Sequence, residues 1–193
     1  MEDELFKYLS QYITLTEEEA HQLIQLDLIK KYKKGTVLLK EGVVSNKSYF
    51  VLKGCLRTYY LVDGEEKTTA FYTEKQGISP QCCITGIASE YYLTCVEDCI
   101  LCVSTTDMEQ SFFEQFPRFE SLCRVMAEQQ LSEQQTSFDK YMHSSPEQRY
   151  VHLMETRADL IQRVPQYQLA SYLGIKPESL SRIRKRLFNQ KKS

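Results

Sequence analysis

The chain has 193 residues, of which 42% are hydrophobic and 26% are charged, and its net charge at pH 7 is −2. This length is enough for one large domain or two smaller ones, and the composition is that of a folded globular protein, which excludes a disordered chain. No apolar run reaches the roughly 18 to 20 residues of a spanning helix, and the first residues lack the layout of a secretory signal, so a cytoplasmic protein without a membrane segment is expected.

The small net charge conceals a strong asymmetry along the chain. Residues 163–193 contain eight basic residues and one acidic residue, a balance of +7, whereas residues 1–162 contain 16 basic and 25 acidic residues, a balance of −9. A polyanionic partner is therefore expected to meet the C-terminal segment.

The first half of the chain predicts helices followed by strands. Residues 1–30 carry apolar residues at helical spacing, and Thr16 with Glu19 three positions later predicts a capped helix start. From Lys33 onward, short runs rich in Val, Thr, Tyr and Phe are separated by glycines, which predicts an antiparallel unit of about eight short strands. Asp63 and Gly64 predict a tight hairpin, because both turn positions tolerate a positive φ.

After Asp107 the pattern returns to helix. Residues 117–142 have no internal glycine or proline and predict one unbroken helix of about 25 residues. A long, partly apolar helix between two domains often buries its apolar stripe against a second copy; packing onto its own β unit is the alternative. A further helix is predicted to begin with Ser144 or Ser145 as its cap and Pro146 in its first turn.

The segment QLASYLGIKPESLSRIRKRL, residues 168–187, has the spacing of a helix-turn-helix. A first helix at about residues 166–173 is expected to end at Gly174, and Pro177 opens the second helix. Ala170 lies where two steeply crossing helices approach most closely. The residues predicted to share the core are Leu169, Leu173, Ile175, Leu180, Ile183 and Leu187.

The opposite face of the second helix is predicted to contact double-stranded DNA. Glu178, Arg182, Lys185 and Asn189 share one stripe that can reach base edges, where arginine binds guanine and glutamate accepts from cytosine. A solvated basic helix is the alternative, but the turn, the small residue, the proline and the apolar spacing occur together. The flanking residues expected near phosphates are Lys176, Ser179, Ser181, Arg184 and Arg186, and Gln166 completes the predicted contacts.

These residues resemble the recognition unit of the Crp/Fnr family of bacterial transcription regulators, and residues 33–72 resemble the start of its cyclic-nucleotide-binding-type β-roll. The resemblance implies an α+β fold: an N-terminal antiparallel, jelly-roll-like β-roll with flanking helices as the effector domain (residues 1–115), a dimerisation helix (116–142) and a C-terminal winged helix-turn-helix (143–193). It implies a homodimeric transcription regulator that binds a palindromic operator, with RNA polymerase and a small-molecule effector as further partners. Glu178 and Arg182 match the family's recognition helix, but Pro177 stands where the family has an arginine, so one base contact of the better-known members is missing.

The effector region departs from the members that bind cyclic AMP, which use Gly-Glu followed by Arg-Ser or Arg-Thr. Ser89 and Glu90 stand at the latter pair, and no Lys or Arg occurs between Gln76 and Cys102. A phosphate beside Glu90 would lack a compensating cation, so control by cyclic AMP is not expected. Either another molecule, apolar or aromatic, binds there, or the sensor is vestigial and the regulator constitutive. The residues predicted to line the effector pocket are Gln81, Cys82, Ser89, Glu90, Tyr91 and Tyr92.

No enzyme, metal or cofactor is expected. The seven cysteines form no paired framework and are interpreted as reduced structural thiols, with metal ligation and redox sensing as alternatives. Cys95, Cys99 and Cys102 lie close in sequence, but the odd offset from 99 to 102 reverses the face of a strand. The three histidines lack ligand spacing, and no catalytic serine elbow or phosphate loop is present. The remaining alternative is a small-molecule-binding barrel whose basic tail binds nucleic acid without specificity.

Overall fold

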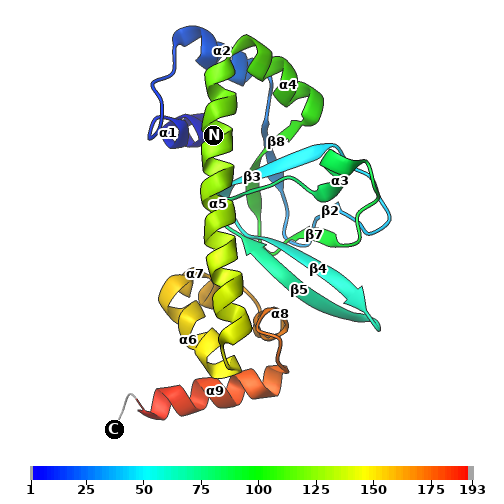
Figure 1. The fold of residues 1–193 in the computed structure, drawn as a ribbon, viewed down its shortest axis with the longest axis vertical. Helices are drawn as coiled ribbons and strands as arrows, with labels where there is room; N and C mark the ends of the chain where they lie inside the picture. The colour runs from blue at the N-terminus through cyan, green and yellow to red at the C-terminus, as the bar shows by residue number, and fades with distance from the viewer. Residues whose placement is uncertain (1, 191–193) are drawn as a thin grey trace. The chain divides into compact units, whose positions relative to one another are not determined.

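The computed structural model describes residues 2–190, and the chain divides into two units (Figure 1). The first unit comprises residues 1–58 and 71–132, and the second comprises residues 59–70 and 133–193. A β-hairpin from the middle of the chain therefore groups with the C-terminal helices.

Eight strands among residues 2–190 form two four-stranded sheets, which confirms the predicted β unit. The first sheet has the order β1-β8-β3-β6 and the second the order β2-β7-β4-β5. The pairs β1–β8, β2–β7, β3–β6 and β3–β8 are antiparallel; Ile29 lies opposite Cys102, and Tyr49 lies opposite Val103. The strands are β1 (Ile29–Tyr32), β2 (Val37–Leu39), β3 (Lys47–Lys53), β4 (Leu56–Val62), β5 (Glu65–Tyr72), β6 (Gly77–Ile78), β7 (Tyr92–Cys95) and β8 (Cys99–Thr105).

The β unit closes around one apolar core. Val51, Leu56, Leu93 and Leu101 are fully buried and come from four different strands. Val51, Leu93 and Leu101 alternate with more exposed neighbours, as strands with one buried face require, whereas Leu56 begins a run of buried residues on β4. Helix α3 (Gln81–Thr85) contributes Cys82 to the same core.

A second apolar cluster holds the helices of the first unit together. It joins α2 (Glu17–Gln25), α4 (Thr106–Gln115) and the first turns of α5 (Pro117–His143) through Leu23, Phe112 and Phe119. The rings of Phe112 and Phe119 meet edge to face with centroids 5.0 Å apart. Figure 1 shows α2 and α4 beside the start of α5, while α1 (Glu2–Leu9) lies nearby.

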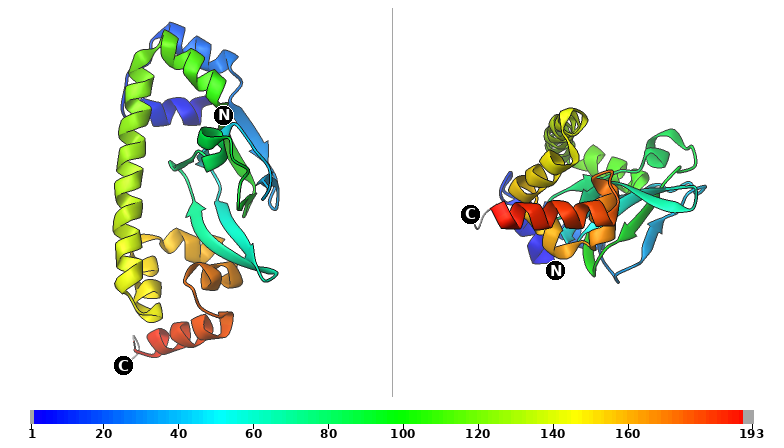
Figure 2. Two further views of the ribbon diagram at one scale, coloured as in Figure 1. Left: turned by 45° about the vertical axis from the view of Figure 1, so that its right-hand side comes forward. Right: turned by 90° about the horizontal axis from the view of Figure 1, so that it is seen from below.

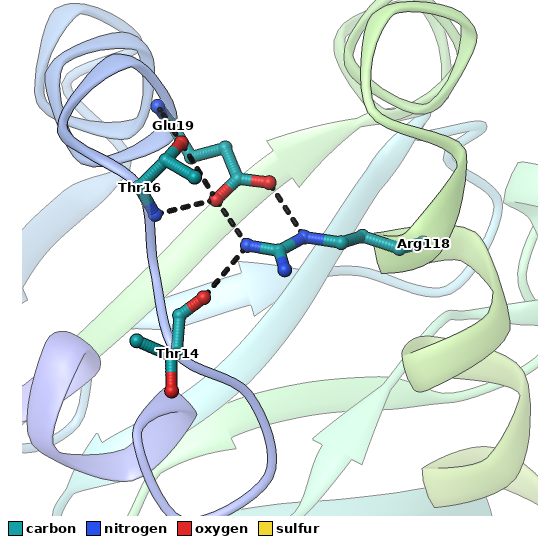
Figure 3. Close-up of polar contacts among 4 residues, drawn as sticks. All are labelled: Thr14, Thr16, Glu19 and Arg118. Atoms are coloured by element: carbon teal, nitrogen blue, oxygen red, sulfur yellow. Dashed lines mark hydrogen bonds and ion pairs between the residues drawn. The ribbon is translucent and has the colours of Figure 1, made fainter.

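A polar network fixes the start of α2 and ties it to α5 (Figure 3). Thr16 caps α2 and forms the predicted capping box with Glu19, whose Oε2 accepts from the Thr16 N–H at 2.7 Å. Arg118 on α5 donates from Nε to Glu19 Oε1 at 2.6 Å and from Nη2 to the Thr14 carbonyl at 2.8 Å. Burial raises the pKa of Glu19, but the hydrogen bonds from Arg118 and Thr16 outweigh it and hold this pKa below its ordinary value.

The predicted hairpin is present at Asp63 and Gly64, whose φ angles are +54° and +79°. Two successive positive φ angles are those of a type I′ turn, which matches the twist of the flanking strands β4 and β5. The hairpin belongs to the second unit from Tyr59 to Ala70.

The C-terminal helices follow the predictions with two differences. The helix α5 runs unbroken from Pro117 to His143, and Ser145 caps α6 (Pro146–Thr156) in a capping box with Gln148. The chain leaves the helical conformation at Arg157, so α7 (Ala158–Arg163) is separate, although no glycine or proline predicts that break. Residues 143–190 contain helices and turns and no assigned strand, so the wing that the resemblance implied is not observed on this segment.

None of the helices within residues 2–190 is both long enough and apolar enough to cross a bilayer.

Candidate nucleic-acid interface

The last two helices are joined by a turn built on Gly174. Helix α8 (Gln166–Tyr172) ends with Leu173 as its cap, and Gly174 has φ +70°. The Ile175 N–H donates to the Ala170 carbonyl and the Gly174 N–H donates to the Ser171 carbonyl, both at 3.0 Å. This pair of bonds is a Schellman motif, which satisfies carbonyls at the end of α8 and turns the chain toward α9 (Pro177–Gln190).

One face of α9 is anchored in the core of the second unit. Leu180 is fully buried and Ile183 is 8% exposed, while Leu169 and Leu173 of α8 are buried opposite them. Ala170 is fully buried, as expected for a small residue at the crossing of the two helices. Four of the six predicted core residues are therefore buried, and the other two, Ile175 and Leu187, are half-buried.

The other face of α9 is open. Glu178, Arg182, Lys185 and Asn189 are all exposed on one stripe, as their spacing predicted. Arg182, Lys185, Arg186, Asn189 and Gln190 border an open depression. Within residues 2–190 the Arg182 guanidinium has no hydrogen bond or ion pair, so it is available to an external acceptor. Seen from below in Figure 2, α9 (red) lies in front of the other helices of its unit.

Not every predicted DNA contact lies on this open stripe. Lys176 is exposed at the start of α9 and Ser179 is half-buried. The Gln166 amide donates to the Ser181 hydroxyl at 2.6 Å, which ties the start of α8 to α9. Arg186 pairs with Glu147 of α6, donating from Nε at 3.1 Å, so its guanidinium stabilises the helix packing in this structure. Lys191 and Lys192 of the basic tail lie outside the described residues.

Arg149 joins the end of α5 to the turn between α8 and α9. Its guanidinium lies 3.7 Å from the centroid of the Tyr141 ring, and its Nε donates to the Tyr141 carbonyl at 3.1 Å. Its Nη1 donates to the Leu173 carbonyl at 3.2 Å. A methyl group on Gly174 would lie 2.6 Å from the Tyr141 hydroxyl. Sequence reasoning missed Arg149 and Tyr141, because nothing in their local pattern indicates these contacts.

Helix α5 exposes apolar side chains away from its buried side. Leu122, Met126 and Gln130 are half-buried, and the Gln130 amide exchanges hydrogen bonds of 3.0 and 2.8 Å with the backbone of Gly77. A second stripe, Leu131, Phe138 and Met142, has the spacing of one helix face and is 55–62% exposed. Within residues 2–190, none of these three side chains is buried as a core side chain is.

The six predicted effector residues differ in how far their side chains are buried. Cys82 and Ser89 are buried, whereas Gln81 and Glu90 are exposed, and Tyr91 and Tyr92 are half-buried. The Ser89 hydroxyl donates to the Tyr91 carbonyl at 2.9 Å and so serves the local chain. The sequence reasoning also passed over Arg57 on β4, a cation only 3% exposed, which interacts with neighbouring groups.

The seven cysteines are free thiols; five of them lie in or against the two apolar clusters, and Cys123 is exposed. Cys95 and Cys99 lie in the β core, and Cys102 packs against the helical cluster, which confirms the predicted reversal of face between 99 and 102. Burial is the main cause that raises the pKa of Cys102 to about 12. Among the described residues, no group of three His, Cys, Asp or Glu side chains is arranged to hold a metal ion.

Comparison with known proteins places this geometry in a recognised fold. Residues 29–116 match the family model described as cyclic nucleotide-binding domain. FixK2 from Bradyrhizobium japonicum superposes with a TM-score of 0.69 at 17% identity, covering 84% of each chain. The chain has the fold of the Crp/Fnr regulators.

Two further structures with the Crp/Fnr fold extend over most of the chain. CooA from Carboxydothermus hydrogenoformans superposes with a TM-score of 0.66 at 16% identity, covering 84% of this chain and 76% of that one. The c-di-GMP responsive global regulator CLP of Xanthomonas campestris gives 0.64 at 17% identity, covering 88% and 92%. No curated protein sequence matches significantly. The predicted resemblance is thus confirmed at the level of the Crp/Fnr fold.

Proposed function

We propose that this protein is a sequence-specific, DNA-binding transcription regulator that acts as a homodimer on a palindromic operator. The observation that carries the proposal is the two-sided character of α9. Its apolar face is buried against α8 behind a Schellman turn, and its polar face presents to solvent Arg182 and Lys185, which have no partner within residues 2–190. A helix held in this way can enter the major groove, which is wide enough to admit it.

The residues on the open stripe are assigned to base edges. Arg182 binds guanine through its two-pronged donor set, and Glu178 accepts a hydrogen bond from cytosine. Lys176, Ser179 and Lys185 lie beside them and are assigned to phosphates and flanking bases. Gln166 at the start of α8 and Ser181 on α9, which are hydrogen-bonded to each other, are assigned together to the DNA backbone. Arg186 is assigned to the packing of α9 on α6, because Glu147 holds its guanidinium.

The apolar stripe of α5 supports the homodimer. Leu131, Phe138 and Met142 follow intervals of seven and four residues, which is the spacing of a coiled-coil seam. The opposite side of the helix already packs on its own unit through Gln130 and Met126. A second copy of α5 would cover the stripe, and a palindromic operator would then require the two copies of α9 to lie about one DNA turn, roughly 34 Å, apart.

Control by cyclic AMP is not part of the proposal. The segment between Gln76 and Cys102 contains no lysine or arginine to hold a cyclic phosphate. Glu90, at the position where a hydroxyl residue would be needed, is an exposed carboxylate that would repel the anion. An uncharged effector is compatible with this chemistry, and so is a regulator without an effector.

The experiment that tests the proposal compares two arginines of α9. DNA fragments that the protein retains from its host's genomic DNA supply the specific site, and a scrambled duplex supplies the reference. Arg182→Ala should lose about 1–3 kcal/mol on the selected site and little on the scrambled duplex. Arg184→Ala removes the same charge from an exposed flanking position and should weaken binding to both duplexes equally. Equal losses on both duplexes for Arg182→Ala would contradict base readout.

A further inference from the structure

Ser171 on α8 holds the edge of the β4–β5 hairpin. Its hydroxyl accepts a hydrogen bond from the Thr68 N–H at 2.9 Å and donates one to the Glu66 carbonyl at 2.8 Å. Both views of the fold show the hairpin (cyan) beside α8 (orange) (Figures 1 and 2). The first helix of the helix-turn-helix is therefore bonded to the backbone of a strand about 100 residues earlier in the chain.

The two backbone groups that bond to Ser171 belong to an edge strand, which has one row of N–H and C=O groups without a neighbouring strand. Strand β5 stands at the end of the order β2-β7-β4-β5, so its outer edge lacks a neighbouring strand. The N–H of Thr68 and the C=O of Glu66 come from residues two apart, which point to the same edge of a strand. A serine hydroxyl is both donor and acceptor, so Ser171 replaces one residue of the missing partner strand.

The docked hairpin brings negative charge to the DNA-binding side of this unit. Its turn carries Asp63, Glu65 and Glu66 against one cation, Lys67. Lys67 is the main cause that lowers the pKa of Glu65, and Lys176 lowers it further. Lys176 immediately precedes α9 and is one of the side chains assigned to phosphate. The negative charge of Glu65 therefore opposes the approach of a phosphate to Lys176.

The docked arrangement also contains a feature that favours its release. Thr68 is 6% exposed, and its buried hydroxyl lacks a hydrogen-bond partner among residues 2–190. A buried hydroxyl without a hydrogen-bond partner is destabilising, so this hydroxyl favours any opening of the contact that admits water to Thr68. The two hydrogen bonds to Ser171 hold the docked hairpin, and the unsatisfied hydroxyl of Thr68 acts against them.

We propose that the outer edge of β5 is an internal docking surface for α8 and that this contact is autoinhibitory. The docked hairpin restrains α8 and keeps DNA phosphates from Lys176, and DNA binding requires its release. This inference rests on the proposed function, because it names a control on the same DNA-binding surface.

Two substitutions should move the equilibrium in opposite directions. Ser171→Ala removes both bonds to the hairpin and keeps α8, because alanine is the best helix former. Thr68→Val removes the unsatisfied hydroxyl and keeps a β-branched side chain suited to a strand. Ser144→Ala is the matched control, since its hydroxyl bonds to the Lys140 carbonyl and not to the hairpin.

The measurements are hydrogen exchange at the Thr68 amide and affinity for a mixed-sequence DNA duplex at low salt. In Ser171→Ala the Thr68 amide should exchange about tenfold faster and the duplex should bind about three- to tenfold more tightly. Thr68→Val should slow this exchange and weaken binding about threefold. Ser144→Ala should match the unmodified chain in both measurements.

Unchanged or weaker DNA binding by Ser171→Ala would overturn the autoinhibitory role, and unchanged exchange at Thr68 would overturn the docking itself. Failure of every form to bind the duplex would overturn the inference together with the proposed function. A chain that binds DNA and shows base readout at Arg182, but whose affinity does not respond at Ser171, would overturn the inference alone.

Discussion

Replacing Gly174 by alanine tests the geometry of the turn that aims α9. Two costs are expected. The first is conformational, because φ is +70° and an L residue in the left-handed region loses about 1–2 kcal/mol. The second is steric, because the new methyl group would lie 2.6 Å from the Tyr141 hydroxyl. The Tyr141 ring cannot move away freely, since the Arg149 guanidinium covers it at 3.7 Å, and overpacking of this kind costs about 1–3 kcal/mol. The expected total is about 2–5 kcal/mol.

Gly64 and Tyr141 supply the controls that separate these two costs. Gly64 has φ +79° in the same unit with no atom within 4 Å of the added methyl group, so Gly64→Ala should show the conformational cost alone. Tyr141→Phe removes the clashing oxygen, after which the nearest atom of that ring lies 3.9 Å away and Arg149 Nη1 lies 3.4 Å away. The double variant Tyr141→Phe, Gly174→Ala should therefore recover the steric cost.

The assay is the free energy of opening measured by native-state hydrogen exchange at amides of α8 and α9, since the chain has two units and need not unfold in one step. A coupling energy of about 1–3 kcal/mol between positions 141 and 174 is expected from the double-mutant cycle. The reasoning is refuted if Gly174→Ala costs no more than Gly64→Ala, or if Tyr141→Phe restores nothing.

Two further predictions concern α5. Leu131→Asp should weaken the dimer at least about 100-fold in sedimentation, because a carboxylate would be buried in the seam. Val125 is equally exposed but lies off the stripe, so Val125→Asp should leave the dimer intact. Equal behaviour of the two variants would exclude this seam. Arg118→Ala should cost about 2–3 kcal/mol at pH 7, because the Glu19 carboxylate stays buried without its partner. The folded-state pKa of Glu19 is lowered, so its stabilisation is present above the ordinary value of 4.5 and is lost as the pH falls through the lowered pKa. The stability difference between the two forms should therefore shrink as the pH falls below this ordinary value in urea titrations, and a difference that is independent of pH would contradict the role of Glu19.

Local chemistry in the sequence was sufficient to predict most of the elements. Thr16 and Ser145 are polar residues that cap helices through their own hydroxyls, and Asp63 with Gly64 adopts a turn that few other residues tolerate. The helix-turn-helix could also be predicted, because it depends on local features. A glycine favours the positive φ at position 174, and Leu180 and Ile183 are about one helical turn apart. The outward stripe with Arg182 follows from the same spacing once the inward face is known.

The sequence did not predict the contacts between side chains that lie far apart along the chain. Arg186 pairs with Glu147, 39 residues away, and no local pattern in the sequence distinguishes Arg186 from Arg182. The predicted effector residues lie close in sequence, yet the fold buries Cys82 and Ser89 and exposes Gln81 and Glu90.

The sequence thus determined the order of the elements, the inward and outward faces of α9 and its positive charge, because each depends on backbone preferences and periodicity within a few turns. Only the tertiary structure decided that Arg149 connects α5 to the Gly174 turn and that Ser171 holds the edge of β5. Each of those contacts joins a side chain to a backbone carbonyl or amide, and nearly every residue has these backbone groups. The identity of the partner is therefore invisible in the sequence and is fixed only when the chain folds.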